Sequence, residues 1–373
     1  MKYYFIAGEA SGDLHASNLI KALRGKDAEA EIRAWGGDLM EAAGATVVKH
    51  YRDLAFMGFV EVVRNIRTIM GNFRACKEDI IAFQPDALVL VDYPGFNLRM
   101  AKWAKKEGLK VFYYISPQLW AWHSSRVHGI KANIDRMFVI LPFEKDFYAG
   151  YDYEVDFVGH PLLDVVDHFD ARLDIRDELK IGDQPIIALL PGSRRQEISR
   201  MLPTMLSVVA DYPDYQFVVA GAPSIPADFY GEYLQAAPDN VHLISGYTYA
   251  LLDLAYAALV TSGTATLETG LFAVPQIVCY RGSQLSYLIA RRLVNVKYIS
   301  LVNLILDRPL VKELIQQAFS PAHLKTAFRE LLDPETREAM QSGYQDLRKA
   351  LGEAGAAERT AELIVRDLCV NRQ

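Results

Sequence analysis

The sequence predicts an α/β protein built from two doubly wound, Rossmann-like domains that face each other across a crevice. Short apolar runs alternate with segments of helical periodicity along nearly the whole chain, which is typical of repeated βαβ units. The runs are apolar on both faces, as in parallel strands covered by helices. A length of 373 residues suggests two domains. In such folds ligands bind beyond the carboxyl ends of the strands, so residues just after strands are the candidates for function.

Ten apolar runs are expected to be strands. They are 3–7, 31–35, 87–91, 110–115 and 136–140 in the first half, and 185–190, 215–220, 241–244, 257–260 and 275–279 in the second. The charged segment 164–183 separates the two series, which predicts domains at 1–164 and 165–353. After about Ser320 only helices are expected, and by fold analogy the last one, about 354–373, packs back on the first domain.

The composition excludes several classes of protein. Hydrophobic residues make up 51% and charged residues 23%, as in a globular chain, and the net charge of −6 argues against nucleic-acid binding. Three cysteines lie far apart, so we expect neither a disulfide framework nor a zinc site. The first residues lack a signal-peptide core, and no 18-residue stretch is apolar and uncharged. We therefore expect a soluble protein, attached at most to a membrane surface.

The stretch 257–270 combines a strand, a small-residue turn and a helix start. Ser262, Gly263 and Thr264 form the turn, and its backbone N–H groups would point outward with the positive end of the helix dipole. Such a corner binds phosphate. Glu268 lies one turn along the same helix face, where its carboxylate suits ribose hydroxyls. An ordinary connection with Ser and Thr as helix caps remains an equal alternative.

A second anion corner follows the strand at 185–190. Gly192 and Ser193 open a helix, Arg194 would stabilise charge on a departing diphosphate, and Glu197 belongs to the same helix start. Exposed arginine pairs are also often only solvated. No Asp-x-Asp pair occurs, so we expect no metal site and no cofactor, with helix dipoles and Arg194 replacing the cation. Asn303 follows another expected strand.

The first strand ends in GEASGD, residues 8–13. Gly8 and Gly12 permit a tight turn and close approach of a ligand, although the spacing is not that of a dinucleotide fingerprint. Glu9 and Ser11 would contact a sugar acceptor. The alternative is a capped helix start.

Asp92 follows the buried strand at 87–91 and is the candidate general base. A carboxyl group at the end of a buried strand is desolvated, which raises its pKa toward the working range of a base. Asn97, in the same loop, is expected to line the crevice. Asp92 could instead simply start the Pro-Gly turn that follows it.

Further candidates for the crevice follow two later strands. Gln118, Trp120 and His123 belong to an aromatic-rich loop that suits a sugar or an acyl chain. A loop that packs into the core would have the same composition, and His123 would then be a structural histidine. His160 is as consistent with a hinge or a crevice lining as with catalysis.

Residues 56–76 form an amphipathic helix with cations around a broad apolar face. This pattern alone favours packing against the core, but a lipid substrate would favour docking into a membrane interface. The membrane-facing candidates are Phe59, Val60, Val63, Ile66, Ile69 and Met70.

Eight motifs together resemble one known family, the lipid-A-disaccharide synthases, which are inverting glycosyltransferases of the two-domain GT-B type (family 19). One departure is Gly95, where many relatives carry a second acidic residue. The motifs are GEASGD (8–13), MGFVEV (57–62), VDYPGFN (91–97), SPQLWAW (116–122), VGHP (158–161), LLPGSRRQEI (189–198), SGTATLE (262–268) and SLVN (300–303).

The resemblance implies transfer of 2,3-diacylglucosamine from UDP-2,3-diacylglucosamine to 2,3-diacylglucosamine 1-phosphate (lipid X), giving a β-1′,6-linked disaccharide and UDP. It implies Asp92 as base, Glu9 and Ser11 as orienting groups, and Glu268 and Asn303 as contacts of the nucleoside. It also implies peripheral attachment to the cytoplasmic face of a Gram-negative inner membrane. A different UDP-sugar enzyme of the same fold and a non-catalytic binding protein remain alternatives, and a homodimer remains open.

Overall fold

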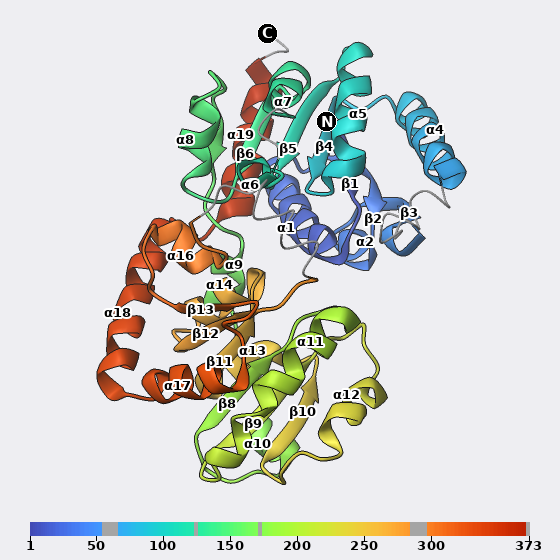
Figure 1. The fold of residues 1–373 in the computed structure, drawn as a ribbon. Coiled ribbons are helices and arrows are strands. Elements are labelled where there is room, and N and C mark those ends of the chain that lie inside the picture. Colours follow the sequence, from blue (N-terminus) through green and yellow to red (C-terminus); the bar gives the residue numbers. More distant parts are fainter. Residues whose placement is uncertain (54–65, 123–125, 171–173, 284–296, 371–373) are drawn as a thin grey trace. The chain divides into compact units, whose positions relative to one another are not determined.

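A computed structural model describes residues 1–53, 66–122, 126–170, 174–283 and 297–370 (Figure 1). Its chain divides into two compact units. The first comprises Met1–Asp164 with Leu351–Gln373, and the second comprises Val165–Ala350. In the described part of the chain, no helix is both long and apolar enough to cross a bilayer.

The first unit holds a seven-stranded, all-parallel sheet in the order β3-β2-β1-β4-β5-β6-β7. Its elements along the chain are β1 (Lys2–Ala7), α1 (Ala10–Lys26), β2 (Glu31–Gly36), α2 (Asp38–Ala42), β3 (Thr46–His50), a 3₁₀ turn η1 (Tyr51–Asp53), α4 (Ile66–Phe83), β4 (Ala87–Val91), α5 (Pro94–Lys106), β5 (Lys110–Tyr114), α6 (Leu119–Trp122), α7 (Val127–Asn133), β6 (Arg136–Val139), α8 (Glu144–Ala149), β7 (Asp156–Phe157) and the terminal α19 (Ala356–Val370), while α9 (Leu162–Asp167) leads into the second unit.

The second unit holds a six-stranded parallel sheet in the order β10-β9-β8-β11-β12-β13. Its elements are α10 (Ile175–Leu179), β8 (Ile186–Leu190), α11 (Arg195–Leu206), η3 (Val209–Asp211), β9 (Gln216–Gly221), α12 (Ala227–Leu234), β10 (Val241–Ser245), α13 (Thr248–Leu254), β11 (Ala255–Thr261), α14 (Thr264–Leu271), β12 (Gln276–Tyr280), α16 (Leu301–Leu306), β13 (Lys312–Ile315), α17 (Pro321–Leu331) and α18 (Pro334–Ala350).

The two faces of the first sheet explain why its strands are apolar throughout. Along β1, Tyr3 and Phe5 enter one buried cluster, whereas Tyr4 and Ile6 enter the other, because successive side chains of a strand point to opposite faces. Ile364 of α19 belongs to the first cluster, and α19 lies against α1. The prediction of an α/β fold with two parallel, helix-covered sheets is therefore confirmed.

The sequence reading missed the strands β3, β7 and β13. All three are sheet edges, each paired on one side only. An edge strand needs no continuous apolar run, since one side of it faces solvent or a loop. Thus Lys312–Ile315 carries two charges, and Asp156–Phe157 has only two residues. All ten strands that were expected are present.

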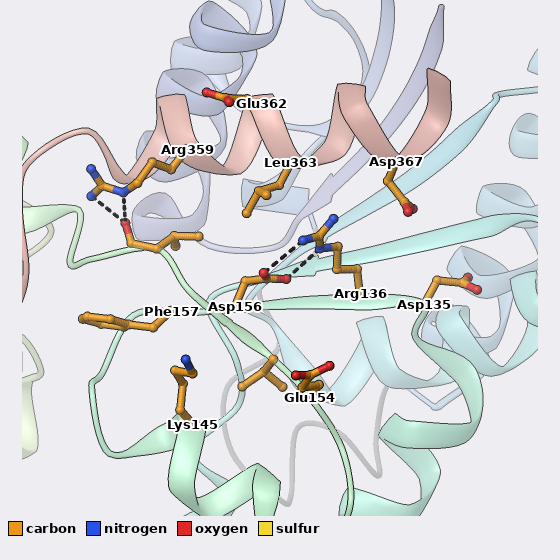
Figure 2. Close-up of a pocket in the computed structure, with 12 residues that line it drawn as sticks. Asp135, Arg136, Lys145, Glu154, Asp156, Phe157, Arg359, Glu362, Leu363 and Asp367 are labelled. Atoms are coloured by element: carbon orange, nitrogen blue, oxygen red, sulfur yellow. Dashed lines mark hydrogen bonds and ion pairs between the residues drawn. The ribbon is translucent and has the colours of Figure 1, made fainter. Parts of the chain in front are cut away.

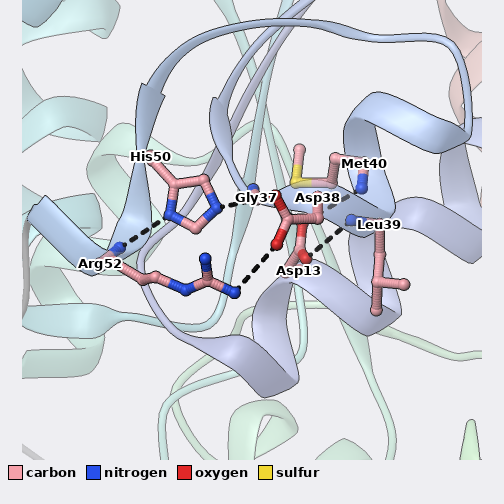
Figure 3. A network of polar contacts seen from close by, with 7 residues as sticks. All are labelled: Asp13, Gly37, Asp38, Leu39, Met40, His50 and Arg52. Carbon is pink, nitrogen blue, oxygen red and sulfur yellow. Dashed lines mark hydrogen bonds and ion pairs between the residues drawn. The ribbon is translucent and has the colours of Figure 1, made fainter.

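Asp13, the last residue of the GEASGD segment, joins α1 to the start of α2 (Figure 3). It is 2% exposed, and its carboxylate accepts hydrogen bonds from the N–H groups of Gly37 (2.8 Å), Leu39 (3.1 Å) and Met40 (3.2 Å). No side chain from the α2 N-cap itself does so. Asp13 therefore caps α2 and fixes the loop that follows β1.

We expect Asp13→Ala to lower the free energy of unfolding by about 2 kcal/mol, since three backbone donors lose a charged acceptor. This corresponds to a fall in Tm of roughly 4–8 °C. Differential scanning calorimetry measures it directly.

The matched control is Asp38→Ala. Asp38 opens the same helix but is exposed, and it pairs with Arg52 (2.9 Å) and His50 (3.4 Å). Exposed pairs contribute about 0–1 kcal/mol. An equal loss of stability in the two variants would contradict the role given to Asp13.

Candidate active site

Parallel register brings three of the motifs to one edge of the first sheet. Ala7 lies beside Val91, and Val91 lies beside Tyr114, at the carboxyl ends of β1, β4 and β5. The loops that begin at Gly8, Asp92 and Ile115 are therefore neighbours, although 107 residues separate the first from the last along the chain (115 minus 8). This edge is the expected ligand-binding position of a doubly wound sheet.

Three residues at the same edge have a left-handed backbone. Asp92 and Tyr93 follow β4 with φ values of 45° and 49°, and Ile115 follows β5 with a φ of 65°. A left-handed conformation is disfavoured for non-glycine residues, most of all for a β-branched one. Strained backbone of this kind collects at functional sites, where the surrounding structure holds it in place.

Asp92 has the properties of a general base at this edge. Burial raises the pKa of its carboxyl group to about 6, and the negative charge of Glu9 contributes to the increase. A hydrogen bond from the backbone of Tyr93 opposes it. The group is therefore mostly ionised at neutral pH, yet basic enough to take a proton from a hydroxyl group in the transition state.

Asn97 does not line the site surface, contrary to the expectation. It is fully buried, and its amide nitrogen donates to the backbone oxygens of Asp92 (2.7 Å), Val91 (3.2 Å) and Ile6 (3.3 Å). Sequence reasoning missed this because a polar residue after a strand gives no sign of whether it points outward or back at the chain.

The GEASGD loop leaves two polar side chains free to meet a ligand. Glu9 and Ser11 are exposed, and Glu9 precedes α1 without forming a side-chain cap. Gly8 is required because a Cβ atom there would lie 2.2 Å from the ring of Tyr93. At Gly12 a Cβ atom would lie 3.3 Å from that of Ala7, so α1 approaches β1 closely.

The loop after β5 rests on a buried carboxyl group that the sequence reading did not single out. Glu144 is 1% exposed, accepts a hydrogen bond from the hydroxyl of Ser116, and accepts another from the N–H of Leu141 (2.9 Å). Burial raises its pKa to about 7, against the opposing effect of these donors. Glu144 thus joins the carboxyl ends of β5 and β6.

Of the residues expected in this loop, Gln118 is exposed and Trp120 is partly buried, with its ring edge-on to Phe143 at 5.0 Å. His123 lies outside the described residues. His160 is 4% exposed, and its Nδ1 accepts from the N–H of Leu162 (3.2 Å).

Burial and the proximity of His15 lower the pKa of His160 to about 3, so this imidazole is neutral at physiological pH. The backbone N–H of His160 donates to the carbonyl oxygen of Leu351 (3.2 Å), so this residue joins the two passages of the chain through the first unit.

In the second unit, register again places two candidate turns side by side. Leu190 at the end of β8 lies beside Val260 of β11. The turn after β11 leads through Gly263, whose φ of 155° and ψ of −163° are a combination that essentially only glycine adopts. Among the described residues no side chain caps α14, so within this part of the chain its first N–H groups are available to an anion.

The turn after β8 differs from expectation because the side chain of Glu197 already accepts hydrogen bonds from its backbone N–H groups. Glu197 accepts from the N–H groups of Ser193 (3.1 Å) and Arg194 (3.2 Å), and it pairs with the Arg194 guanidinium (3.1 Å). Gly192 has a φ of 112°, and a Cβ atom there would lie 2.7 Å from this carboxylate. An anion at this corner would have to displace Glu197. At the turn before α14, by contrast, no described side chain occupies the backbone N–H groups.

Glu268 lines a cavity of about 360 Å³ at the carboxyl side of the second sheet. The hydroxyl of Tyr249 donates to its carboxylate (2.9 Å), and burial raises the pKa of Glu268 despite this bond. The rest of the lining is Phe169, Pro223, Gly246, Tyr247, Thr248 and Ala250. The sequence did not single out these residues. Gly246–Thr248 follow an expected strand, so the rule that residues just after strands are candidates would have included them.

One other expectation for this unit, the position of Asn303, needs correction. Asn303 lies in α16, not after a strand, and it is fully buried, with its amide bonded to Val311 (2.8 Å) and Glu313 (3.0 Å). It therefore has a structural role. Ser262 donates its hydroxyl to the backbone oxygen of Ile299 (2.9 Å), so it secures the neighbouring segment.

A larger cavity, of about 670 Å³, lies along the open edge of the first sheet, between β7 and α19 (Figure 2). Arg136 pairs with Asp156 there (2.6 Å), and Arg359 donates to the backbone oxygen of Val158. These contacts secure β7 and α19 to the sheet. The cavity is lined by none of the candidate residues, and size alone does not make it the site.

The apolar helix is only partly described. Phe59, Val60 and Val63 lie outside the described residues, as does the side chain of Ile66. Ile69 packs against the core and does not face outward as predicted, because its neighbour Phe73 stacks on Phe96 at 4.2 Å and brings this face onto the sheet. Met70 is 60% exposed.

Comparisons with solved structures identify the fold. The UDP-GlcNAc 2-epimerase from Neisseria meningitidis aligns with a TM-score of 0.66 and 13% identity, covering 99% of this chain and 100% of that one. A kitacinnamycin glycosyltransferase aligns with a TM-score of 0.67 and 16% identity, covering 98% of each chain. The architecture is therefore that of GT-B proteins, which include both epimerases and glycosyltransferases.

Sequence comparison separates these classes. A lipid-A-disaccharide synthase from Syntrophus aciditrophicus is 41% identical over 363 residues, which is 95% of each chain. A family model described as lipid-A-disaccharide synthetase matches residues 3–366. With this match over nearly its whole length, the chain belongs to the lipid-A-disaccharide synthetase family of glycosyltransferases.

Proposed function

We propose that the protein transfers 2,3-diacylglucosamine from UDP-2,3-diacylglucosamine to the 6-hydroxyl of 2,3-diacylglucosamine 1-phosphate. The product is a β-1′,6-linked disaccharide, and UDP is released. Family membership over residues 3–366 is the observation that carries the proposal. The desolvated carboxyl group of Asp92 at a strained sheet edge supports it, because an inverting transfer needs one base.

The step is a single displacement. Asp92 takes the proton of the acceptor 6-hydroxyl as its oxygen attacks C1 of the donor sugar. The bond between C1 and the diphosphate oxygen breaks, and its electron pair leaves with UDP. Attack opposite the leaving group inverts C1. Glu9 and Ser11, exposed beside Asp92, orient the acceptor.

The second unit holds the donor. The uncapped N–H groups of α14 bind the diphosphate at Gly263 and Thr264, where the helix dipole favours negative charge. Arg194 adds a cation when its pair with Glu197 opens. The nucleoside occupies the cavity that Glu268 and Tyr249 line, and a volume of about 360 Å³ lies within the usual range for ligand pockets.

The substrates carry acyl chains, so the protein must work at a membrane surface, which we propose is the cytoplasmic face of the inner membrane. Helix α4 supports this. Met70, Arg74 and Ile81 lie on one face of the helix and are all exposed, and Arg74 pairs there with Glu78 (2.7 Å), so two apolar side chains flank an exposed ion pair.

Asp92→Asn is expected to lower kcat by roughly 10²–10⁴-fold while the KM for the donor stays within about twofold, because only the base is lost. Asparagine also tolerates the left-handed backbone. In the unaltered protein, kcat/KM should rise with pH through about 6, as Asp92 ionises. A radiolabel assay of UDP release measures both. Asp135→Asn, at the amino end of β6, is the control, and near-normal turnover in Asp92→Asn would remove Asp92 as the base.

The Asp92→Asn variant should also be more stable than the unaltered protein at pH 8, as measured by its Tm. The folded pKa of Asp92, about 6, exceeds its ordinary value of 3.8, so the native state binds this proton more tightly. The stability that this proton contributes is lost as pH rises through 6. The gain in Tm should therefore vanish below pH 3.8.

Glu268→Ala is expected to weaken UDP binding by roughly 10- to 100-fold, the equivalent of one or two charge-assisted hydrogen bonds. At saturating donor, kcat should change little. Isothermal titration calorimetry with UDP measures the affinity, and Glu178→Ala, an exposed carboxylate of the same unit, is the control. Unchanged affinity in Glu268→Ala would place the nucleoside elsewhere.

Met70→Glu is expected to reduce binding to anionic phospholipid vesicles in a flotation assay, because a carboxylate opposes insertion of this face. UDP affinity should not change. Leu39→Glu alters a side chain 45% exposed on α2 and is the matched control. Equal loss of vesicle binding in both variants would argue against α4 as the docking element.

A further inference from the structure

One buried amide holds the strained turn at Asp92. The Asn97 side chain is fully buried and makes its contacts by donation, to the carbonyl oxygens of Asp92 (2.7 Å), Val91 (3.2 Å) and Ile6 (3.3 Å). Its own oxygen is buried and has no hydrogen-bond partner among the described residues. The side chain thus faces the backbone of the site rather than a ligand.

These contacts connect two strands that carry different parts of the site. Ile6 is near the end of β1, two residues before Gly8, whereas Val91 ends β4 and Asp92 follows it. Asn97 therefore fixes the loop of Glu9 relative to the loop of Asp92. A third strand contributes as well, because Tyr113 of β5 donates its hydroxyl to the Asp92 carbonyl oxygen (2.6 Å).

The turn requires such support. Asp92 and Tyr93 are both left-handed, and each non-glycine residue in this region costs about 1–3 kcal/mol. The N–H of Asp92 is held as well, by the carbonyl oxygen of Tyr114 (3.0 Å). Without the donors to its carbonyl oxygen, the peptide after Asp92 is free to rotate, and the carboxylate moves with it.

We propose that Asn97, assisted by Tyr113, is a positioning residue that holds the backbone of Asp92 in its left-handed conformation and so aims the carboxylate at the acceptor hydroxyl. The inference rests on the proposed function only where it names the acceptor. That Asn97 controls the environment of Asp92 can be tested without turnover.

Among the described residues, the titratable groups that interact with the Asp92 carboxylate are Glu9 and the phenol of Tyr113, while the phenol of Tyr93 interacts with Glu9. Burial and the Glu9 charge raise the pKa of Asp92. If the turn relaxes, the carboxyl group gains water and moves away from Glu9. Its pKa should then fall from about 6 toward 3.8.

The test compares Asn97→Ala and Tyr113→Phe with the unaltered protein. Carbon-13 NMR titration of aspartate carboxyls, with the Asp92 signal assigned by its loss in Asp92→Asn, gives the pKa independently of activity. We expect a clear fall in Asn97→Ala and a smaller one in Tyr113→Phe. In the UDP-release assay, kcat should fall roughly 10- to 100-fold in Asn97→Ala, with KM for both substrates within about twofold. The pH at which kcat/KM falls on the acid side should move to lower pH together with the Asp92 pKa that NMR measures.

Asn240→Ala is the matched control. Asn240 also donates its amide to two backbone oxygens, those of Tyr212 (3.4 Å) and Tyr215 (2.8 Å), in the second unit. It should lower Tm without altering the pKa of Asp92 or the pH profile.

An unchanged Asp92 pKa in both Asn97→Ala and Tyr113→Phe would overturn the inference. If Asn97→Ala does not fold, Tyr113→Phe decides alone. Absence of UDP release by the unaltered protein, with the NMR shifts as expected, would refute the proposed function and leave the positioning role standing.

Discussion

The site depends on parallel pairing between strands that are distant in the sequence. Because β1, β4 and β5 run in the same direction and in fixed register, the loops that follow them meet at one edge. The pairing of β8 with β11 does the same for the two glycine turns of the second unit. A shift of one residue would turn every side chain of a strand to the opposite face and disrupt the close packing on both faces, so the two buried clusters protect the geometry of the loops.

Stability and function oppose each other at Asp92. Its backbone is strained and its carboxyl group is desolvated, and both features destabilise the fold at neutral pH. Two buried donors, Asn97 and the core residue Tyr113, offset part of this cost by hydrogen bonding to the Asp92 carbonyl oxygen. By contrast, Asp13 in the first turn of α1 makes a structural contact, because it caps α2.

The strands of the interior and the loops after them could be predicted because apolar runs and chain order are visible in a sequence. Three of the edge strands, β3, β7 and β13, could not; β7, for example, has two residues and no apolar run. The direction in which a polar side chain points could not be predicted either. Asn97 and Asn303 each follow an expected strand, yet both amides turn inward to backbone groups. Glu197 has the residue type of a ligand contact but caps its own helix.

The proposed position of the donor diphosphate depends on a difference between the two turns of the second unit. One is closed by Glu197, and the other, at Gly263, has no side-chain cap. The most direct measurement is a crystal structure of the protein with UDP. The account predicts diphosphate oxygens on the N–H groups of Gly263 and Thr264, with the ribose hydroxyls on Glu268. A diphosphate bound away from this turn, or held only through a metal ion, would contradict it.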